Sequence, residues 1–256
     1  MRFFKELFLL TRRLLLHSFR MPAFVLIAIV QPVLWLALFG PLFGRVVELG
    51  GFGAGSYLDF LLPGVAVMSA LFGSAYSGMA LLMDIDRAIL DRLLVTPVSR
   101  GALIGAYIAN SGFVVMVQVL TILLFGRLLG ANLPEGVTPY LLILAAAALL
   151  GIGFGALSNA LALALRRHDA IIAVMNFITL PLFFLSSMIM SPEIMPDWIR
   201  IASGFNPVNW AVELARGAFA GAGAGFLLLA AVKLAGFSLL TTSLAASGFR
   251  RFMRTA

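Results

Sequence analysis

The sequence has no cysteine, and it has only two histidines and two lysines among its 256 residues. The absence of cysteine excludes a disulfide framework, a thiolate metal site and a cysteine nucleophile. Two histidines are too few for most metal sites built from histidine alone. A phosphate-binding loop needs a lysine after a glycine, but Lys5 follows Phe4 and Lys233 follows Val232. We therefore expect the chain to hold no metal and to hydrolyse no nucleotide by itself.

Charged residues are also scarce. They make up 11% of the chain, against about 25% in an ordinary soluble domain. Hydrophobic residues make up 62%, and the mean hydropathy is +1.06. One soluble core could not hide this much apolar surface, because a folded domain still exposes a large share of its atoms. The composition therefore predicts an integral membrane protein.

Six apolar stretches are long enough to cross a hydrocarbon core of about 30 Å, which takes about 20 helical residues. They cover residues 22–43, 60–83, 101–126, 140–165, 170–190 and 226–247. Backbone groups in lipid must be satisfied within the segment, so we expect helices. The prediction is one all-α transmembrane domain over residues 1–256, with six transmembrane helices.

The basic residues give an orientation. Of the 18 Lys and Arg residues, 13 lie in segments 2–20, 87–100, 166–167 and 250–254, all on one side of the predicted spans. The positive-inside rule places that side, and both termini, in the cytoplasm. The net charge of +7 is explained in this way, so we expect no nucleic acid as a partner.

Residues 1–20 form an amphipathic pattern at 100° per residue. The charged residues and His17 fall on one face, and Phe3, Leu7, Leu14 and their neighbours fall on the other. A basic amphipathic helix of this kind lies in the membrane interface. The alternative is the solvated start of the first span.

Residues 84–96 form a cytoplasmic segment that is dense in charge. We expect a short helix with a ridge of Ile85, Ile89 and Leu93, which suits docking into a groove on a partner. A plain connecting loop is the alternative. The segment ends at Thr96-Pro97, and Ser99 is expected to cap the next helix.

The same segment holds Asp84, Asp86 and Asp91, and clustered aspartates could bind a metal in an enzyme that processes lipids. Arg87 and Arg92 are interleaved with these carboxylates, however. Local ion pairing along a helix is therefore the simpler interpretation.

Polar residues inside the spans give candidates for a transport path. Gln31-Pro32 should kink the first span, because proline leaves carbonyls unpaired. Lys233 is the one formal charge within a span; it either contacts substrate, extends outward to the interface, or pairs with Glu213. Asn176 is expected to bond between helices, together with the other polar residues of the spans, Asn110, Gln118, Asn159 and Thr179. Glycines 73, 78, 151, 153 and 155 are expected to permit close helix packing.

Three motifs in order resemble the type-2 ABC transporter permeases, membrane subunits of drug and polysaccharide exporters, and among these the daunorubicin-resistance-like branch. They are FRMPAFVLIAIVQPVLWLALF (19–39), LDRLLVTPVSRGALIGAYI (90–108) and SPEIMPDWIRIASGFNPVNWAVELARG (191–217). The resemblance covers nearly the whole chain. It implies a permease subunit, not itself an enzyme, in the cell (inner) membrane, which moves a hydrophobic drug, a lipid-like compound or a glycan outward and can confer antibiotic resistance.

The resemblance also implies partners and site residues. The permease would form a homodimer in membrane lipid and pair with two ATP-binding cassette subunits, which would hold the ATP and Mg. Residues 84–96 would be the coupling helix, and residues 191–225 a re-entrant external hairpin before the last span. Coupling is expected from Asp84, Asp86, Arg87, Ile89, Asp91, Arg92, Leu93, Thr96, Pro97 and Arg100. Pathway or gating roles are expected from Gln31, Pro32, Asn176, Asn206, Pro207, Glu213, Arg216 and Lys233.

Two other functions stay open. A secondary transporter or channel would need charges paired at the middle of broken helices, and Lys233 is the only charge placed for that. An enzyme acting on lipids would depend on the three aspartates of residues 84–96.

Overall fold

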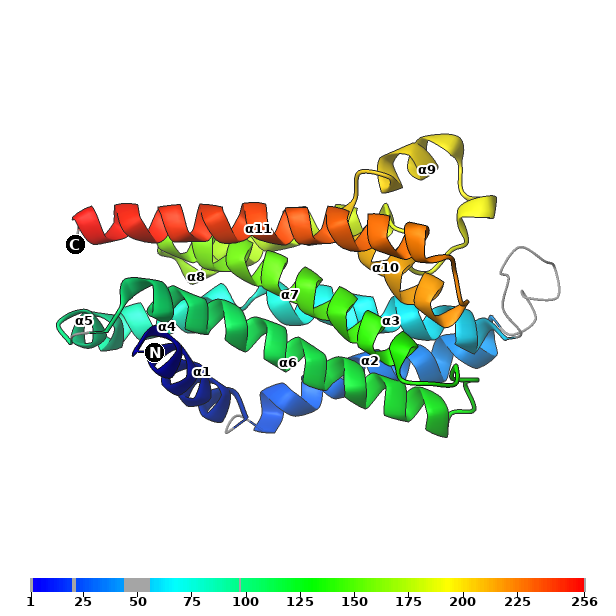
Figure 1. The fold of residues 1–256 in the computed structure, drawn as a ribbon, viewed down its shortest axis with the longest axis horizontal. Helices are drawn as coiled ribbons and strands as arrows, with labels where there is room; N and C mark the ends of the chain where they lie inside the picture. Colours follow the sequence, from blue (N-terminus) through cyan, green and yellow to red (C-terminus); the bar gives the residue numbers. More distant parts are fainter. Residues whose placement is uncertain (1, 20–21, 44–55, 97, 256) are drawn as a thin grey trace.

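The computed structural model describes residues 2–19, 22–43, 56–96 and 98–255. The regular elements of this part of the chain are all helices (Figure 1). They are α1 (Arg2–Phe19), α2 (Pro22–Leu42), α3 (Tyr57–Ala75), α4 (Gly78–Asp86), α5 (Ile89–Leu94), α6 (Arg100–Leu128), α7 (Thr138–Leu165), α8 (His168–Phe184), the 3₁₀ turn η2 (Pro192–Ile194), α9 (Asp197–Ser203), α10 (Pro207–Phe219) and α11 (Ala224–Thr255). The prediction of an all-α protein is confirmed.

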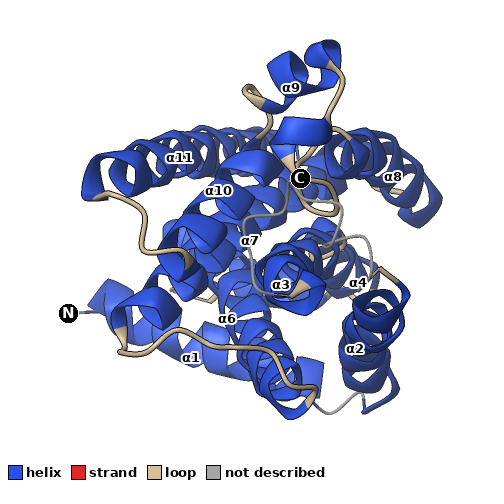
Figure 2. Cartoon of the chain, turned by 90° about the vertical axis from the view of Figure 1, so that its right-hand side faces the viewer, coloured by secondary structure: helices blue, strands red, loops and turns tan. Residues whose placement is uncertain are grey.

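Helix α7 lies at the centre of the bundle. It packs against α3, α4, α6, α10 and α11, and Figure 2 shows it enclosed by them. Its buried side chains include Ile143, Leu150 and Phe154. The long helices run nearly along one axis, and the two ends of the chain lie at the same end of the bundle as α5, whereas α9 lies at the opposite end (Figure 1). We call these the α5 end and the α9 end.

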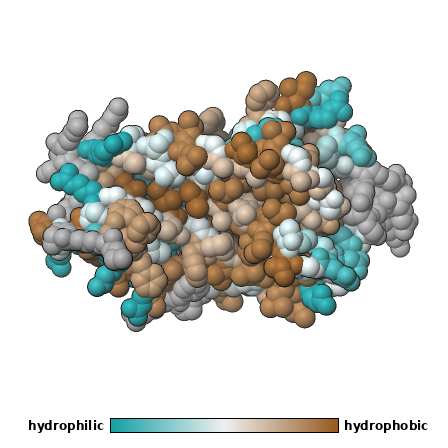
Figure 3. Space-filling model, in the orientation of Figure 1, coloured by the Kyte–Doolittle hydropathy of each residue, from teal (hydrophilic) through white to brown (hydrophobic). Residues whose placement is uncertain are grey.

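Four helical stretches are long and apolar enough to cross a membrane, counted over the described residues: Tyr57–Asp86, which comprises α3 and α4, Arg100–Leu128, Thr138–Leu165 and Ala224–Arg250. Val30–Leu42 and His168–Phe184 are apolar but shorter. Each of the six predicted stretches therefore contains an apolar helix. Only four of these helical stretches meet the length and composition expected of a membrane span, counted over the described residues. Figure 3 shows hydrophobic residues over the middle of the molecule and hydrophilic residues toward both ends, as lipid around the middle requires.

The helix starts follow local sequence. Ser56 precedes α3, and its hydroxyl accepts a hydrogen bond from the Asp59 N–H at 3.1 Å. The Asn206 side chain does the same for α10, accepting from the Val208 N–H at 2.9 Å, and Pro207 occupies the first turn. Both are side-chain caps, which satisfy N–H groups that a helix leaves unpaired.

The predicted span 60–83 is interrupted in the structure. Helix α3 ends at Ala75 and α4 begins at Gly78, so a continuous helix is the wrong expectation here. The break is stabilised by α7: the Ser77 hydroxyl donates to the Gly155 carbonyl at 3.3 Å, and the Gly78 N–H donates to the Ser158 hydroxyl at 3.0 Å. Because these partners lie about 80 residues away, local sequence does not reveal the break.

Close helix packing through glycine is confirmed. A Cβ added at Gly78 would lie 2.3 Å from the Ser158 carbonyl oxygen, and one at Gly155 would lie 2.7 Å from the Ser111 side chain. Real Cβ contacts of this length do not occur, so α4, α6 and α7 meet at distances that only glycine allows.

We predict that Gly78→Ala destabilises the fold, because the obstructing atom is backbone and cannot rotate away. The expected loss is about 1–3 kcal/mol, which is typical of an overpacked core, and it is measured by thermal melting in detergent. Gly236→Ala is the matched control, since Gly236 lies on α11 with no atom within 4 Å of an added Cβ. Equal melting temperatures for the two variants would contradict the close contact of α4 with α7.

Candidate functional site

At the α5 end, Asp84 joins three helices. Its Oδ2 accepts from the Tyr107 hydroxyl of α6 at 2.5 Å and from Arg13 Nη2 of α1 at 3.2 Å. Its side chain is only 13% exposed, so the charge is partly desolvated and depends on these donors. Asp84 therefore fixes the position of α4 relative to α1 and α6.

Asp86 makes a second link at this end. Its Oδ2 lies 2.8 Å from His168 Nε2, at the first residue of α8. Both side chains are exposed, so the link contributes little to stability. It nevertheless joins the end of α4 to the start of α8, two elements that are distant in sequence.

The predicted single helix over residues 84–96 is wrong. Asp84 and Asp86 belong to α4, the chain turns at Arg87–Ala88, and α5 starts at Ile89. Ala88 has φ +53, a left-handed conformation that ends a helix. Alanine rarely takes this conformation, so residue type gives no signal for the turn.

The short α5 carries the remaining predicted coupling residues Ile89, Asp91, Arg92 and Leu93. Leu90, which the predicted ridge did not include, is fully buried, and Ile85 and Leu93 pack against the core beside it. Arg87, Arg92 and Thr96 are exposed, and Val95 is 86% exposed. Pro97 lies outside the described residues. The apolar side of α5 is thus anchored, while Arg92 on α5 and Val95 just after it are exposed.

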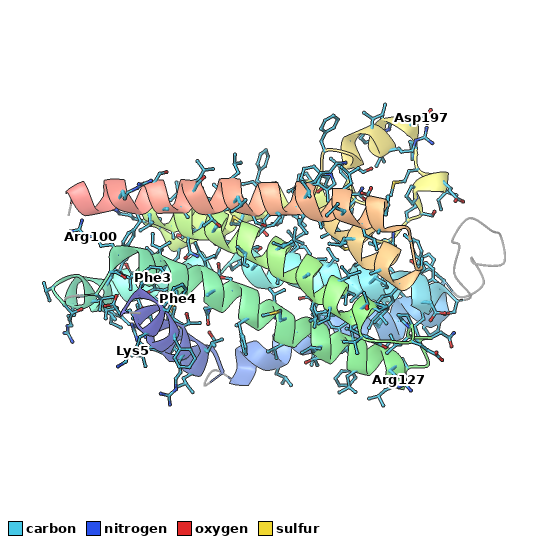
Figure 4. The ribbon with its side chains drawn as sticks, viewed as in Figure 1. Phe3, Phe4, Lys5, Arg100, Arg127 and Asp197 are labelled. Atoms are coloured by element: carbon cyan, nitrogen blue, oxygen red, sulfur yellow. The ribbon has the colours of Figure 1, made fainter. Side chains whose placement is uncertain are left out.

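The start of α6 is capped by a distant residue. The Ser99 N–H donates to the Glu6 carboxylate of α1 at 2.8 Å, whereas the Ser99 hydroxyl makes no cap and is buried without a partner. The predicted Ser99 side-chain cap is therefore wrong. A carboxylate at a helix N-terminus satisfies orphan N–H groups and the helix dipole together. Arg100, the first residue of α6, is exposed at the α5 end (Figure 4).

At the α9 end, Arg216 of α10 connects three segments. Its guanidinium donates to the carbonyls of Phe60 at 3.2 Å, Met188 at 2.5 Å and Ser187, and its Cζ lies 3.6 Å from the centre of the Phe60 ring. A guanidinium carries five N–H donors in a fixed planar arrangement, so it can donate to several carbonyls at once. Gly64 leaves space for this guanidinium, since a Cβ at that position would lie 3.3 Å from Arg216 Nη2. Arg216 therefore holds α10 to α3 and to the turn after α8.

Two asparagines complete this attachment. The Asn206 amide donates to the carbonyls of Leu182 at 2.6 Å and Leu185 at 3.1 Å, at the end of α8. Asn209 accepts from the Ser187 N–H at 2.9 Å and donates to Glu213 at 2.8 Å. Asn209 was not predicted as a site residue; its spacing three residues after Asn206, on one face of a helix, was the available signal.

Lys233 lies beside α10, and among the described residues no salt bridge within 4 Å joins Lys233 to Glu213. Its Nζ is 5.9 Å from the centre of the Trp210 ring, which is a cation–π distance, and the side chain is exposed. The structure thus brings Asn206, Pro207, Glu213, Arg216 and Lys233 to one region.

Gln31 and Pro32 lie on α2, where Gln31 is exposed and Pro32 is buried within a continuous helix.

The polar residues inside the bundle behave differently from one another. Asn176 of α8 accepts from the Tyr76 hydroxyl at 2.5 Å, next to the α3–α4 break, and this confirms interhelical bonding at that residue. Asn159 and Thr179 instead donate to carbonyls of their own helices. The side-chain oxygens of Asn110, Gln118 and Asn159 are buried without a partner.

The fold and the two sites define a multi-pass helical membrane protein with an exposed connector at one end. A family described as ABC-2 type transporter matches residues 5–220 of the chain. The relatives include a transport permease, ycf38, of Cyanophora paradoxa, which is 36% identical over 215 residues, covering 82% of this chain and 73% of that protein. The chain belongs to the ABC-2 type transporter family, and the prediction of an ABC permease is confirmed.

Two further relatives carry drug resistance in their names. The daunorubicin resistance ABC transporter permease protein DrrB1 of Streptomyces coeruleorubidus is 25% identical over 190 residues, covering 73% of this chain and 65% of that protein. The doxorubicin resistance ABC transporter permease protein DrrC of Mycobacterium tuberculosis is 28% identical over 216 residues, covering 84% and 77%. The daunorubicin-resistance-like branch was therefore the right comparison.

We predict that Arg216→Ala loosens the α9 end, because three carbonyls lose their donor in a buried setting. The expected destabilisation is about 3 kcal/mol, with faster hydrogen exchange in α10 and residues 185–190. Arg200→Ala is the control: Arg200 is exposed on α9 and pairs only with Asp197, so a change within about 0.5 kcal/mol is expected. Unchanged exchange in Arg216→Ala would show that the guanidinium does not hold these segments.

Proposed function

We propose that the chain is half of the membrane part of an ATP-driven exporter: two copies pair with two ATP-binding cassette subunits, which hold the ATP and Mg. The observation that carries this is family membership over residues 5–220, together with a short exposed helix, α5, at the end where the basic residues gather. The secondary transporter or channel finds no support, because it requires paired charges at mid-depth and Lys233 has no ion pair within the described residues.

In this proposal the α5 end faces the cytoplasm and the chain crosses the membrane six times. The shorter apolar segments in α2 and α8 then add two crossings to the four long spans. Helix α1 lies at the interface of the inner leaflet. Arg100 and Arg127 lie at opposite ends of α6 (Figure 4), which spans about 42 Å at 1.5 Å per residue, enough to cross the bilayer. Helices α9 and α10 would form the re-entrant hairpin at the outer leaflet.

Coupling would pass from α5 into the bundle. Arg92 and Val95 would contact a groove on the ATP-binding subunit, while buried Leu90 makes α5 move with the core. Motion of the α4–α5 turn would reach α1 and α6 through Asp84, and α8 through the Asp86–His168 link. The α3–α4 break at Tyr76–Ser77 would absorb the change in angle, because it already lacks continuous helix.

The transported compound would be hydrophobic: a drug, a lipid-like molecule or a lipid-linked glycan. The names of the two resistance permeases favour a drug. The hairpin residues Asn206 and Arg216 would control the outer opening, since they connect α10 to α8 and α3, and Glu213 would support them through its bond to Asn209.

The orientation is testable because the chain has no native cysteine to give background labelling. In intact cells, we expect a membrane-impermeant maleimide to label Glu135→Cys, in the exposed loop after α6, and to leave Thr96→Cys unlabelled until the membrane is opened. Both residues are exposed, so accessibility differs only through the membrane. Labelling of Thr96→Cys from outside would reverse the proposed topology.

Docking by α5 is testable by charge reversal. We expect Arg92→Glu, co-reconstituted with the ATP-binding subunit, to lower transport-coupled ATP hydrolysis by about tenfold, because a wrong charge at an interface weakens association by more than a kcal/mol. Arg127→Glu, exposed at the α9 end, is the control and should retain the wild-type rate. If both variants kept the wild-type rate, α5 would not be the docking element.

A further inference from the structure

A basic groove lies between α1 and the α4–α5 turn, apart from the outward face of α5. Its volume is about 460 Å³, and its walls are Leu9, Arg12, Arg13, Leu14, Leu16, His17, Ala80, Asp84, Arg87 and Ile89. The basic residues of these walls are Arg12, Arg13, His17 and Arg87, and their one carboxylate is that of Asp84. Asp84 is already bonded to Arg13 and Tyr107, so Arg12 and Arg87 are left without an acidic partner in the groove.

The rest of the lining is apolar. Leu9, Leu14 and Leu16 line the α1 side, and Ala80 and Ile89 line the other. A groove that offers guanidinium groups and hydrocarbon together fits an amphiphile with an anionic head. Its volume matches that of pockets for molecules with tens of heavy atoms.

Its position selects the occupant. α1 is an amphipathic helix with Phe4 and Phe8 largely exposed on its apolar face, as expected for a helix that rests at the boundary of headgroups and acyl chains. The groove opens beside this helix, at the end of the span Tyr57–Asp86. Guanidinium groups at that depth meet the phosphates of the inner leaflet, which carries anionic lipid.

We propose that this groove binds one anionic phospholipid of the adjoining leaflet, its phosphate held by Arg12 and Arg87 and its upper acyl chains lying on the leucines. The bound lipid would fill the space between α1 and the α4–α5 turn and add to the single Arg13–Asp84 bridge across it. This site requires α1 to lie in the membrane interface, and it does not depend on pairing with an ATP-binding subunit.

The test is native mass spectrometry of the purified full chain, titrated with dioleoylphosphatidylglycerol, dioleoylphosphatidylcholine or glycerol phosphate. We expect binding of one phosphatidylglycerol in preference to phosphatidylcholine, and little binding of glycerol phosphate, which lacks the acyl chains. The variant Arg12→Gln with Arg87→Gln should weaken phosphatidylglycerol binding by about tenfold, since each arginine near an anionic headgroup contributes several-fold. Neither side chain holds the described fold together by an ion pair or hydrogen bond, so the double variant should melt as the wild type does.

The matched control is Arg127→Gln with Arg200→Gln, which removes the same charge: Arg200 lies on α9, and Arg127 lies at the α9 end of α6 (Figure 4). It should retain wild-type lipid binding. If both double variants lost lipid binding equally, the loss would follow from the lower net charge alone, and the proposed site would be overturned. Binding of glycerol phosphate as strong as that of the lipid would make it a soluble-anion site and overturn the lipid. Absence of lipid preference, with loss of ATP-binding subunit association in the groove variant, would make it a protein docking surface instead.

Discussion

The structure depends on satisfying polar groups where water is absent. Long apolar helices pair their own backbone groups, but each helix end and each break leaves carbonyls or N–H groups that lipid cannot solvate. The chain answers with side chains from distant elements: Arg216 and Asn206 for the end of α8, Ser158 for the α3–α4 break, and Glu6 for the start of α6. These contacts lie at the ends and breaks of helices, where the backbone leaves polar groups unpaired.

The two ends of the bundle are built differently. At the α5 end the links are charged and partly exposed, with Asp84 and Asp86 joining α4 to α1, α6 and α8. At the α9 end the Arg216 guanidinium and the Asn206 amide donate to backbone carbonyls, and the Asn209 amide oxygen accepts from the Ser187 N–H. Exposed ion pairs are weak and exchange readily, whereas a buried fork is costly to break. The α5 end should therefore rearrange more easily than the α9 end.

Sequence reasoning located the helices well, because long apolar runs can be read directly from the order of residues. It failed where the backbone departs from regular helix. The turn at Ala88 and the break at Tyr76–Ser77 involve residues that do not by themselves end a helix. Hydrogen bonds to α7 stabilise the break, and the burial of Leu90 accompanies the turn. For Lys233 the sequence left three roles open, and only the fold placed its ammonium 5.9 Å from the centre of the Trp210 ring.

The sequence alone determined the medium, the helical class, the basic end of the bundle and the likeness to ABC permeases, since each follows from residue types and their order. Only the tertiary structure decided that Arg216 bonds to carbonyls of α3 and of the turn after α8, that Glu6 caps α6, and that a basic groove separates α1 from α4. These depend on partners 28 to 156 residues away. The free energy of a buried hydrogen bond or of a basic groove is set by what surrounds it after folding, and no local pattern encodes that.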